Sequence, residues 1–73
     1  MSIRERLRAL RKSQVWLIKE LRKRGIIVQP PELSNILSGL YTFPKARMVL
    51  NISEEILTEV ENGHDSINTR TGN

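Results

Sequence analysis

Apolar residues in the first part of the chain recur at intervals of three and four, the spacing that places side chains on one face of a helix. Ile3, Leu7 and Leu10 form the first such stripe. Ser2 and Glu5 stand where a hydroxyl and a carboxylate can form a capping box at the start of a helix. We therefore predict a basic, amphipathic helix that begins at about residue 3.

A second stripe predicts a helix over residues 14–24. Ser13 stands at the N-cap position, where its hydroxyl can accept a hydrogen bond from a backbone N–H of the first turn. Gly25 can adopt the left-handed conformation that ends a helix. The apolar positions of this predicted helix are Leu17, Ile18 and Leu21.

Residues 26–28 are apolar and β-branched, but a single strand would have no partner, so we interpret them as a buried turn. Pro30 and Pro31 lack amide hydrogens and suit the start of a helix. We predict this helix over residues 31–38, ended by Gly39. Its apolar positions are Leu33, Ile36, Leu37 and Leu40.

The last periodic segment begins at Pro44, which can open a helix that we predict over residues 44–50. Asn51 with Glu54 has the pattern of another capping box. The helical phase beyond it, which runs on to Asn62, therefore belongs either to a separate fifth helix or to a continuation of the fourth.

These elements predict an all-α fold, a small bundle of four to five helices over residues 1–62. Residues 63–73 are polar and cannot recover their ordering entropy by burial, so we expect a flexible tail. The predicted centre of the core consists of Leu17, Leu21, Leu33, Ile36 and Val49.

The composition restricts the class of protein. A chain of 73 residues can form one compact unit, and without cysteine it has neither disulfides nor zinc thiolates. No apolar run approaches the roughly 20 residues of a membrane span, and the first residues do not resemble a signal peptide. We expect a cytoplasmic protein that does not contact a membrane.

Reactive side chains are too few to suggest an enzyme. His64 is the single imidazole and stands in the predicted tail beside Asp65. Glu54 and Glu55 diverge by about 100° on a helix, so we expect them to be solvated or to face a partner. We predict no catalytic activity, no metal site and no cofactor.

The net charge of +4 is unevenly distributed. Residues 1–24 carry nine Lys or Arg against two Glu, which gives +7, whereas residues 48–73 carry one Arg against five acids, which gives -4. A basic face over Arg4, Arg8, Arg11 and Lys12 could contact phosphate or an acidic partner, or could simply be solvated. A polyanion and a protein partner with a polarised surface both fit this distribution.

One set of positions resembles the skeleton of phage repressor and Cro-type helix-turn-helix domains, in which Gln opens the second helix and Gly closes the third. The resemblance covers residues 3–60. The positions that carry it are Gln14, Leu17, Leu21, Gly25, Leu33, Ile36, Gly39 and Pro44. It implies a bundle of the lambda-repressor-like type.

The whole chain is also similar to the small modulators of repression that some temperate phages of Gram-positive bacteria encode beside their immunity repressor. This resemblance implies an antirepressor in the host cytoplasm. Such a protein binds the DNA-binding domain of the phage repressor, blocks its access to the operator and biases the choice between lysis and lysogeny.

The start of the third predicted helix argues against ordinary operator recognition. Pro30 and Pro31 offer no side-chain hydrogen bond, and the carboxylate of Glu32 is repelled by phosphate. Asn35 and Ser38 remain able to contact DNA, as does Gln14. The alternative to the antirepressor is therefore a Cro-like repressor that binds operator DNA directly, alone or jointly with the repressor.

Nine residues are candidates for contact with a partner or with DNA. Trp16 is either an exposed anchor or partly buried, and Tyr41 is a further aromatic candidate, whereas we expect Phe43 to be in the core. The candidates are Gln14, Trp16, Gln29, Glu32, Asn35, Ser38, Tyr41, Lys45 and Arg47.

Overall fold

The computed structural model describes residues 2–63, and over this range the chain is all-helical. The predicted flexible tail lies outside the described residues, except for residue 63. The four helices are α1 (Ile3–Ala9), α2 (Gln14–Lys23), α3 (Pro30–Leu37) and α4 (Pro44–Glu61). The prediction of an all-α fold is confirmed, and the helix bounds differ from the predicted ones by a residue or so at most ends.

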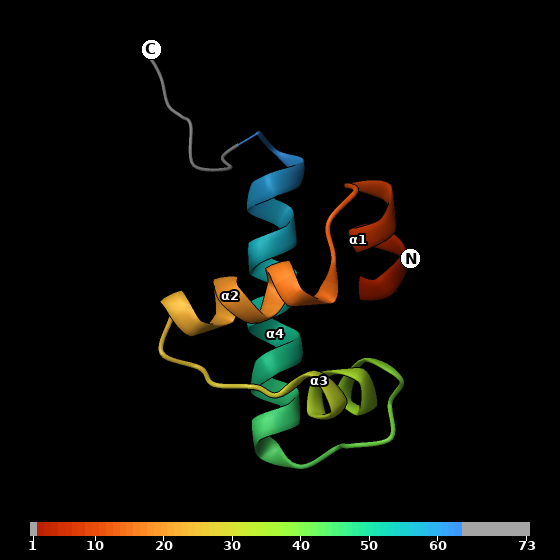
Figure 1. The fold of residues 1–73 in the computed structure, drawn as a ribbon, viewed down its shortest axis with the longest axis vertical. Coiled ribbons are helices and arrows are strands. Elements are labelled where there is room, and N and C mark those ends of the chain that lie inside the picture. Colours follow the sequence, from red (N-terminus) through yellow and green to blue (C-terminus); the bar gives the residue numbers. More distant parts are fainter. Residues whose placement is uncertain (1, 64–73) are drawn as a thin grey trace.

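The long helix α4 is the axis of the molecule, and the three shorter helices lie against it (Figure 1). α1, α2 and α3 all contact α4, and α2 also contacts α3. The link over residues 24–29 carries the chain from the far end of α2 back to α3, past α4 (Figure 1). Each short helix therefore buries its apolar stripe against a common partner.

The first two helices begin with the predicted caps. The Ser2 hydroxyl accepts a hydrogen bond from the Glu5 backbone N–H at 3.1 Å, and the Glu5 carboxylate accepts one from the Ser2 N–H at 2.8 Å. These bonds hold the pKa of Glu5 below its usual range. At α2 the Ser13 hydroxyl accepts from the Trp16 N–H at 3.0 Å.

Left-handed backbone ends α2 and α3 as predicted, since Gly25 has φ of 82° and Gly39 has φ of 85°. A left-handed position at a residue other than glycine was not predicted. Arg11, just after α1, has φ of 59°, and its N–H donates to the Arg8 carbonyl. A residue with a Cβ is strained in this conformation.

The predicted core is confirmed. Leu17, Leu21, Leu33, Ile36 and Val49 are all completely buried. The other buried apolar residues extend this cluster over every helix and the link; they are Ile3, Leu7, Ile18, Val28, Ala46, Ile56 and Leu57.

Residues 44–61 form one continuous helix, which decides between the two alternatives for the fourth and fifth predicted helices. Asn51 is an exposed residue in the middle of α4 and caps nothing. Ser53, two residues later, is fully buried, and its Oγ has no hydrogen-bond partner within residues 2–63. The local capping pattern is overridden because α4 must span all three shorter helices.

Three apolar predictions were wrong. In the link only Val28 is buried, whereas Ile27 is 55% exposed. Leu40 is 69% exposed, because the left-handed turn at Gly39 takes the chain out of the helical phase of α3. Phe43 is 43% exposed rather than in the core, since it is the extended N-cap of α4.

Candidate functional site

The start of α3 exposes two prolines, whereas its carboxylate, that of Glu32, is bound by other groups of the chain. Pro30 and Pro31 are exposed. The Glu32 carboxylate accepts a hydrogen bond from the backbone N–H of Gln29 at 3.3 Å and forms an ion pair with the Lys45 ammonium at 3.2 Å. Two of the candidate residues therefore neutralise each other, and Gln29 is the exposed N-cap of α3.

The other polar side chains of α3 are engaged as well. The Asn35 amide donates to the Tyr41 hydroxyl at 3.2 Å, and both residues are half-buried. The Ser38 hydroxyl donates to the Asn35 carbonyl at 3.0 Å. The Arg4 guanidinium donates to the carbonyl and to the hydroxyl of Ser34, at 3.1 and 2.9 Å. Any contact with a base edge would have to break or share these bonds.

Exposed apolar side chains follow directly after α3 in the chain. Leu40 and Phe43 are exposed, and Met48 on the first turns of α4 is 44% exposed. The Tyr41 and Phe43 rings lie 5.2 Å apart, centroid to centroid. We call Leu40, Tyr41, Phe43 and Met48 the apolar end surface. Sequence reasoning found only Tyr41, although Gly39 before Leu40 and Pro44 after Phe43 both signal breaks in helical phase.

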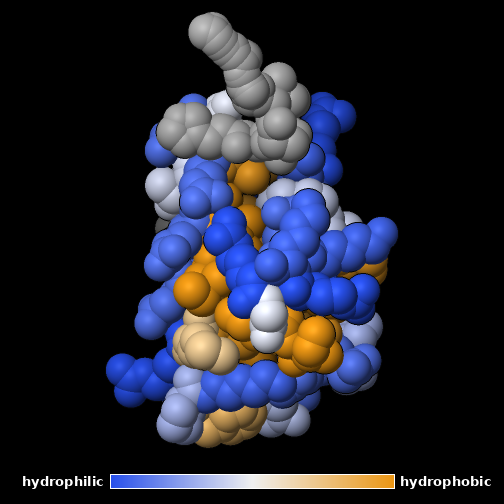
Figure 2. All heavy atoms as spheres, turned by 90° about the vertical axis from the view of Figure 1, so that its left-hand side faces the viewer, coloured by the Kyte–Doolittle hydropathy of each residue, from blue (hydrophilic) through white to orange (hydrophobic). Residues whose placement is uncertain are grey.

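A shallow, open groove of about 630 Å³ continues from this surface along the outer side of α4. It includes Arg47, so this candidate residue lies beside the apolar end surface. The lining residues are Pro44, Arg47, Met48, Asn51, Ile52 and Glu55. Hydrophobic side chains also gather where the link passes α4, with hydrophilic side chains around them (Figure 2).

Gln14 and Trp16 lie on a different part of the molecule, at the start of α2. Trp16 is half-buried and packs against the core, with the Lys12 ammonium 5.1 Å from its ring centroid. Partial burial is therefore the outcome for this side chain. Gln14 lines a pocket of about 240 Å³ together with Arg4, Leu7, Arg8 and Lys12.

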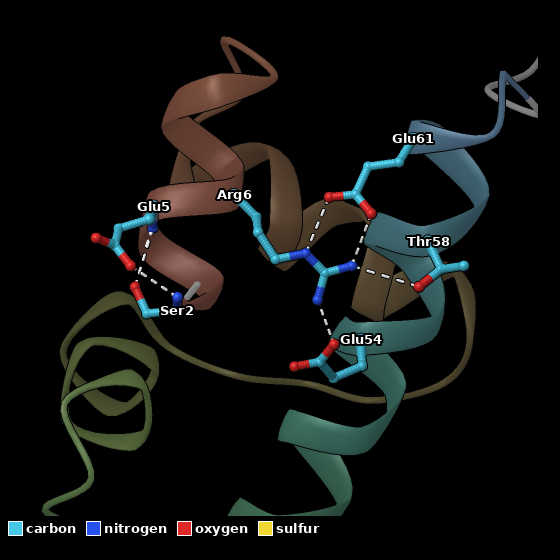
Figure 3. Close-up of polar contacts among 6 residues, drawn as sticks. All are labelled: Ser2, Glu5, Arg6, Glu54, Thr58 and Glu61. Carbon is cyan, nitrogen blue, oxygen red and sulfur yellow. Dashed lines mark hydrogen bonds and ion pairs between the residues drawn. The ribbon is translucent and has the colours of Figure 1, made fainter.

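Arg6 joins α1 to the C-terminal half of α4 and was not among the candidates (Figure 3). Its guanidinium donates two hydrogen bonds of 2.9 Å to the Glu61 carboxylate and one of 3.3 Å to the Thr58 hydroxyl, and it also pairs with Glu54. These contacts raise the pKa of Arg6 and lower the pKa of Glu61. The Glu54 side chain is still 54% exposed, so it is solvated as expected, and it pairs with Arg6 as well.

Further ion pairs reduce the charge that remains for a partner. Arg24, after α2, pairs with Glu59 of α4 at 3.0 Å. Arg6 pairs with Glu54 and Glu61 of the same helix. Three of the four carboxylates in residues 54–63 therefore pair with arginines, and the fourth is Glu55. The basic and acidic halves of the sequence therefore neutralise each other partly within the fold.

Over residues 2–63, no group of His, Cys, Asp and Glu side chains is arranged to hold a metal ion. In the same range no helix has the length and apolar character needed to cross a membrane. No protein-family model matches the chain, and no match is found among the curated proteins or among the solved structures.

Proposed function

We propose that this protein is a helix-turn-helix antirepressor, which binds the DNA-binding domain of a phage repressor and thereby blocks its access to the operator. In this proposal α2 and α3 are the two helices of the motif, and residues 24–29 connect them. The resemblance to phage regulators supplies the identity of the partner. The surface of α3 supports capture of a protein rather than recognition of DNA.

The proposal rests on what is accessible around α3: its polar side chains are bonded within the chain, and apolar side chains are exposed beside them. In a Cro-like reader, free amide or basic side chains on this helix would face base edges in the major groove. Here Glu32, Ser34 and Asn35 are engaged within the chain, and the loop that follows exposes Leu40 and Phe43. Exposed apolar and aromatic groups are suited to the buried centre of a protein interface.

The test is calorimetry of the chain with the DNA-binding domain of the repressor encoded beside it. Leu40→Ser and Phe43→Ser should each weaken binding by about 5- to 30-fold, because truncation of an interface anchor costs about 1 to 2 kcal/mol. Val15→Ser is the matched control, since Val15 is an apolar residue of α2 that is 56% exposed. Equal loss in the control, or no loss in either variant, would contradict the assigned surface.

A Cro-like operator binder is the second candidate, favoured by the pocket that Gln14 shares with Arg4, Arg8 and Lys12, because a phosphate would be attracted there. Non-specific attraction of this kind predicts dissociation constants no tighter than roughly 10⁻⁶ M on any DNA at physiological salt. Gel-shift titrations without the repressor measure this directly. Binding of one operator at about 10⁻⁹ M, with no affinity for the repressor, would establish the Cro-like function instead.

A further inference from the structure

The outer face of α4 carries two opposite charges that have no partner within residues 2–63. Arg47 and Glu55 both line the groove on this face, and neither forms an ion pair in the described part of the chain. This contrasts with Glu54, Glu59 and Glu61 of the same helix, all of which pair with arginines. A partner for this face should therefore present the complementary charges.

The spacing of these charges is symmetric about Asn51. Arg47 precedes Asn51 by four residues and Glu55 follows it by four, so each lies about 6 Å from it along the helix axis. A twofold axis through Asn51, perpendicular to α4, would place Arg47 of each copy against Glu55 of the other. The face is complementary to itself in charge, as an isologous contact requires.

The remaining groove residues suit the centre of such a contact. Pro44, Met48 and Ile52 supply apolar surface along the same face, and the exposed Asn51 amide can donate to and accept from its own copy. Two antiparallel helices also oppose their macrodipoles favourably. We infer that this protein forms a homodimer by antiparallel pairing of the outer face of α4, with Arg47 of each protomer against Glu55 of its partner.

A contact along one helix of 18 residues is small, so the dimer should be weak and should depend on concentration. Sedimentation velocity from about 10 μM to about 1 mM should show the transition from monomer to dimer. Arg47→Glu or Glu55→Arg alone should raise the dimer dissociation constant by about tenfold or more, because like charges then meet twice across the axis. Lys19→Glu makes the same charge change as Arg47→Glu on an exposed site of α2 and should have no effect.

A mixture of the two variants provides a rescue that a merely structural effect could not produce. One chain then presents two Glu and the other two Arg at these positions, so the mixed dimer should form at concentrations where each variant alone is monomeric. Retained helical circular dichroism in each variant shows that the fold is intact. Absence of the mixed dimer, or a monomeric wild type at about 1 mM, would overturn the inference.

Crosslinking tests the position of the axis. The chain has no cysteine, so Asn51→Cys introduces a single thiol. Helices packed at 8–10 Å place facing Cα atoms roughly 3.4 to 5.4 Å apart, which overlaps the range that a disulfide requires. Asn51→Cys should oxidise to a covalent dimer much faster than Lys19→Cys. Equal rates for the two variants would refute pairing about residue 51.

Discussion

Ser53→Ala should stabilise the protein, although it removes a polar group from the middle of α4. Ser53 is completely buried, and among the described residues its Oγ finds no hydrogen-bond partner. A buried hydroxyl left unpaired costs about 1 to 3 kcal/mol relative to its hydrated state. Alanine removes this cost and adds about 0.5 kcal/mol of helix propensity, while the lost atom leaves a void that offsets part of the gain.

The expected net gain is about 1 kcal/mol in the free energy of unfolding. For a domain of 60–100 residues this corresponds to a rise in Tm of about 4 to 8 °C, which thermal unfolding followed by circular dichroism resolves easily. Asn51→Ala is the control for helix propensity, since Asn51 is exposed on the same helix. It should be measured at a few μM, where the dimer that we infer is dissociated.

Comparison of the two variants separates the effect of the buried hydroxyl from that of helix propensity. If Ser53→Ala gains no more stability than Asn51→Ala, desolvation of the hydroxyl is not being relieved. A lower Tm for Ser53→Ala would show that the hydroxyl has a partner whose loss outweighs the gain, and the account of this position would be wrong.

Three other predictions concern the fold. Leu21→Ala and Leu33→Ala should each cost about 2 to 5 kcal/mol by urea unfolding, because both side chains are fully buried; melting like the parent would refute the assigned core. The Arg6 guanidinium holds the pKa of Glu61 below its ordinary value of 4.5, so their pair stabilises the fold above that pH and is lost as the pH falls through the lowered pKa. Arg6→Met should therefore lower the free energy of unfolding at neutral pH and reduce the further decrease of that free energy at acid pH. An unchanged pH dependence would contradict the linkage. Arg11→Gly should raise stability by about 0.5 to 1 kcal/mol, since φ of 59° strains a residue with a Cβ; a lower Tm would show that the side chain contributes more than the strain costs.

Features fixed by near neighbours could be predicted from the sequence. The caps at Ser2 and Ser13 depend on groups three residues away, and the stop at Gly25 depends on its own backbone freedom. The core residues could also be predicted, because the apolar positions of a helix identify its buried face once the ends of the helix are known. Local chemistry and helical periodicity were sufficient for this part of the fold.

Prediction from the sequence failed where contacts between distant segments determine the structure. The capping pattern at Asn51 is locally as good as the one at Ser2, yet α4 continues through it because both halves of the helix bury apolar residues against the shorter helices. Arg6 contacts residues that lie 48 to 55 positions further along the chain, so no local pattern reveals them. Only the excess of carboxylates near the end of α4, opposite a basic first helix, gave a general signal.

The same distinction applies to the candidate site. From charge alone the molecule should have presented a basic half and an acidic half, and either could have attracted a partner. The fold instead pairs Arg6 and Arg24 with carboxylates of α4, and Lys45 with Glu32. The partly exposed pairs of Arg24 and Lys45 contribute little to stability, so their larger consequence is to remove charge from the surface that a partner would meet. What α3 and its following loop then offer is largely apolar, so shape and burial, more than electrostatic attraction, should determine the affinity for the protein partner that we propose.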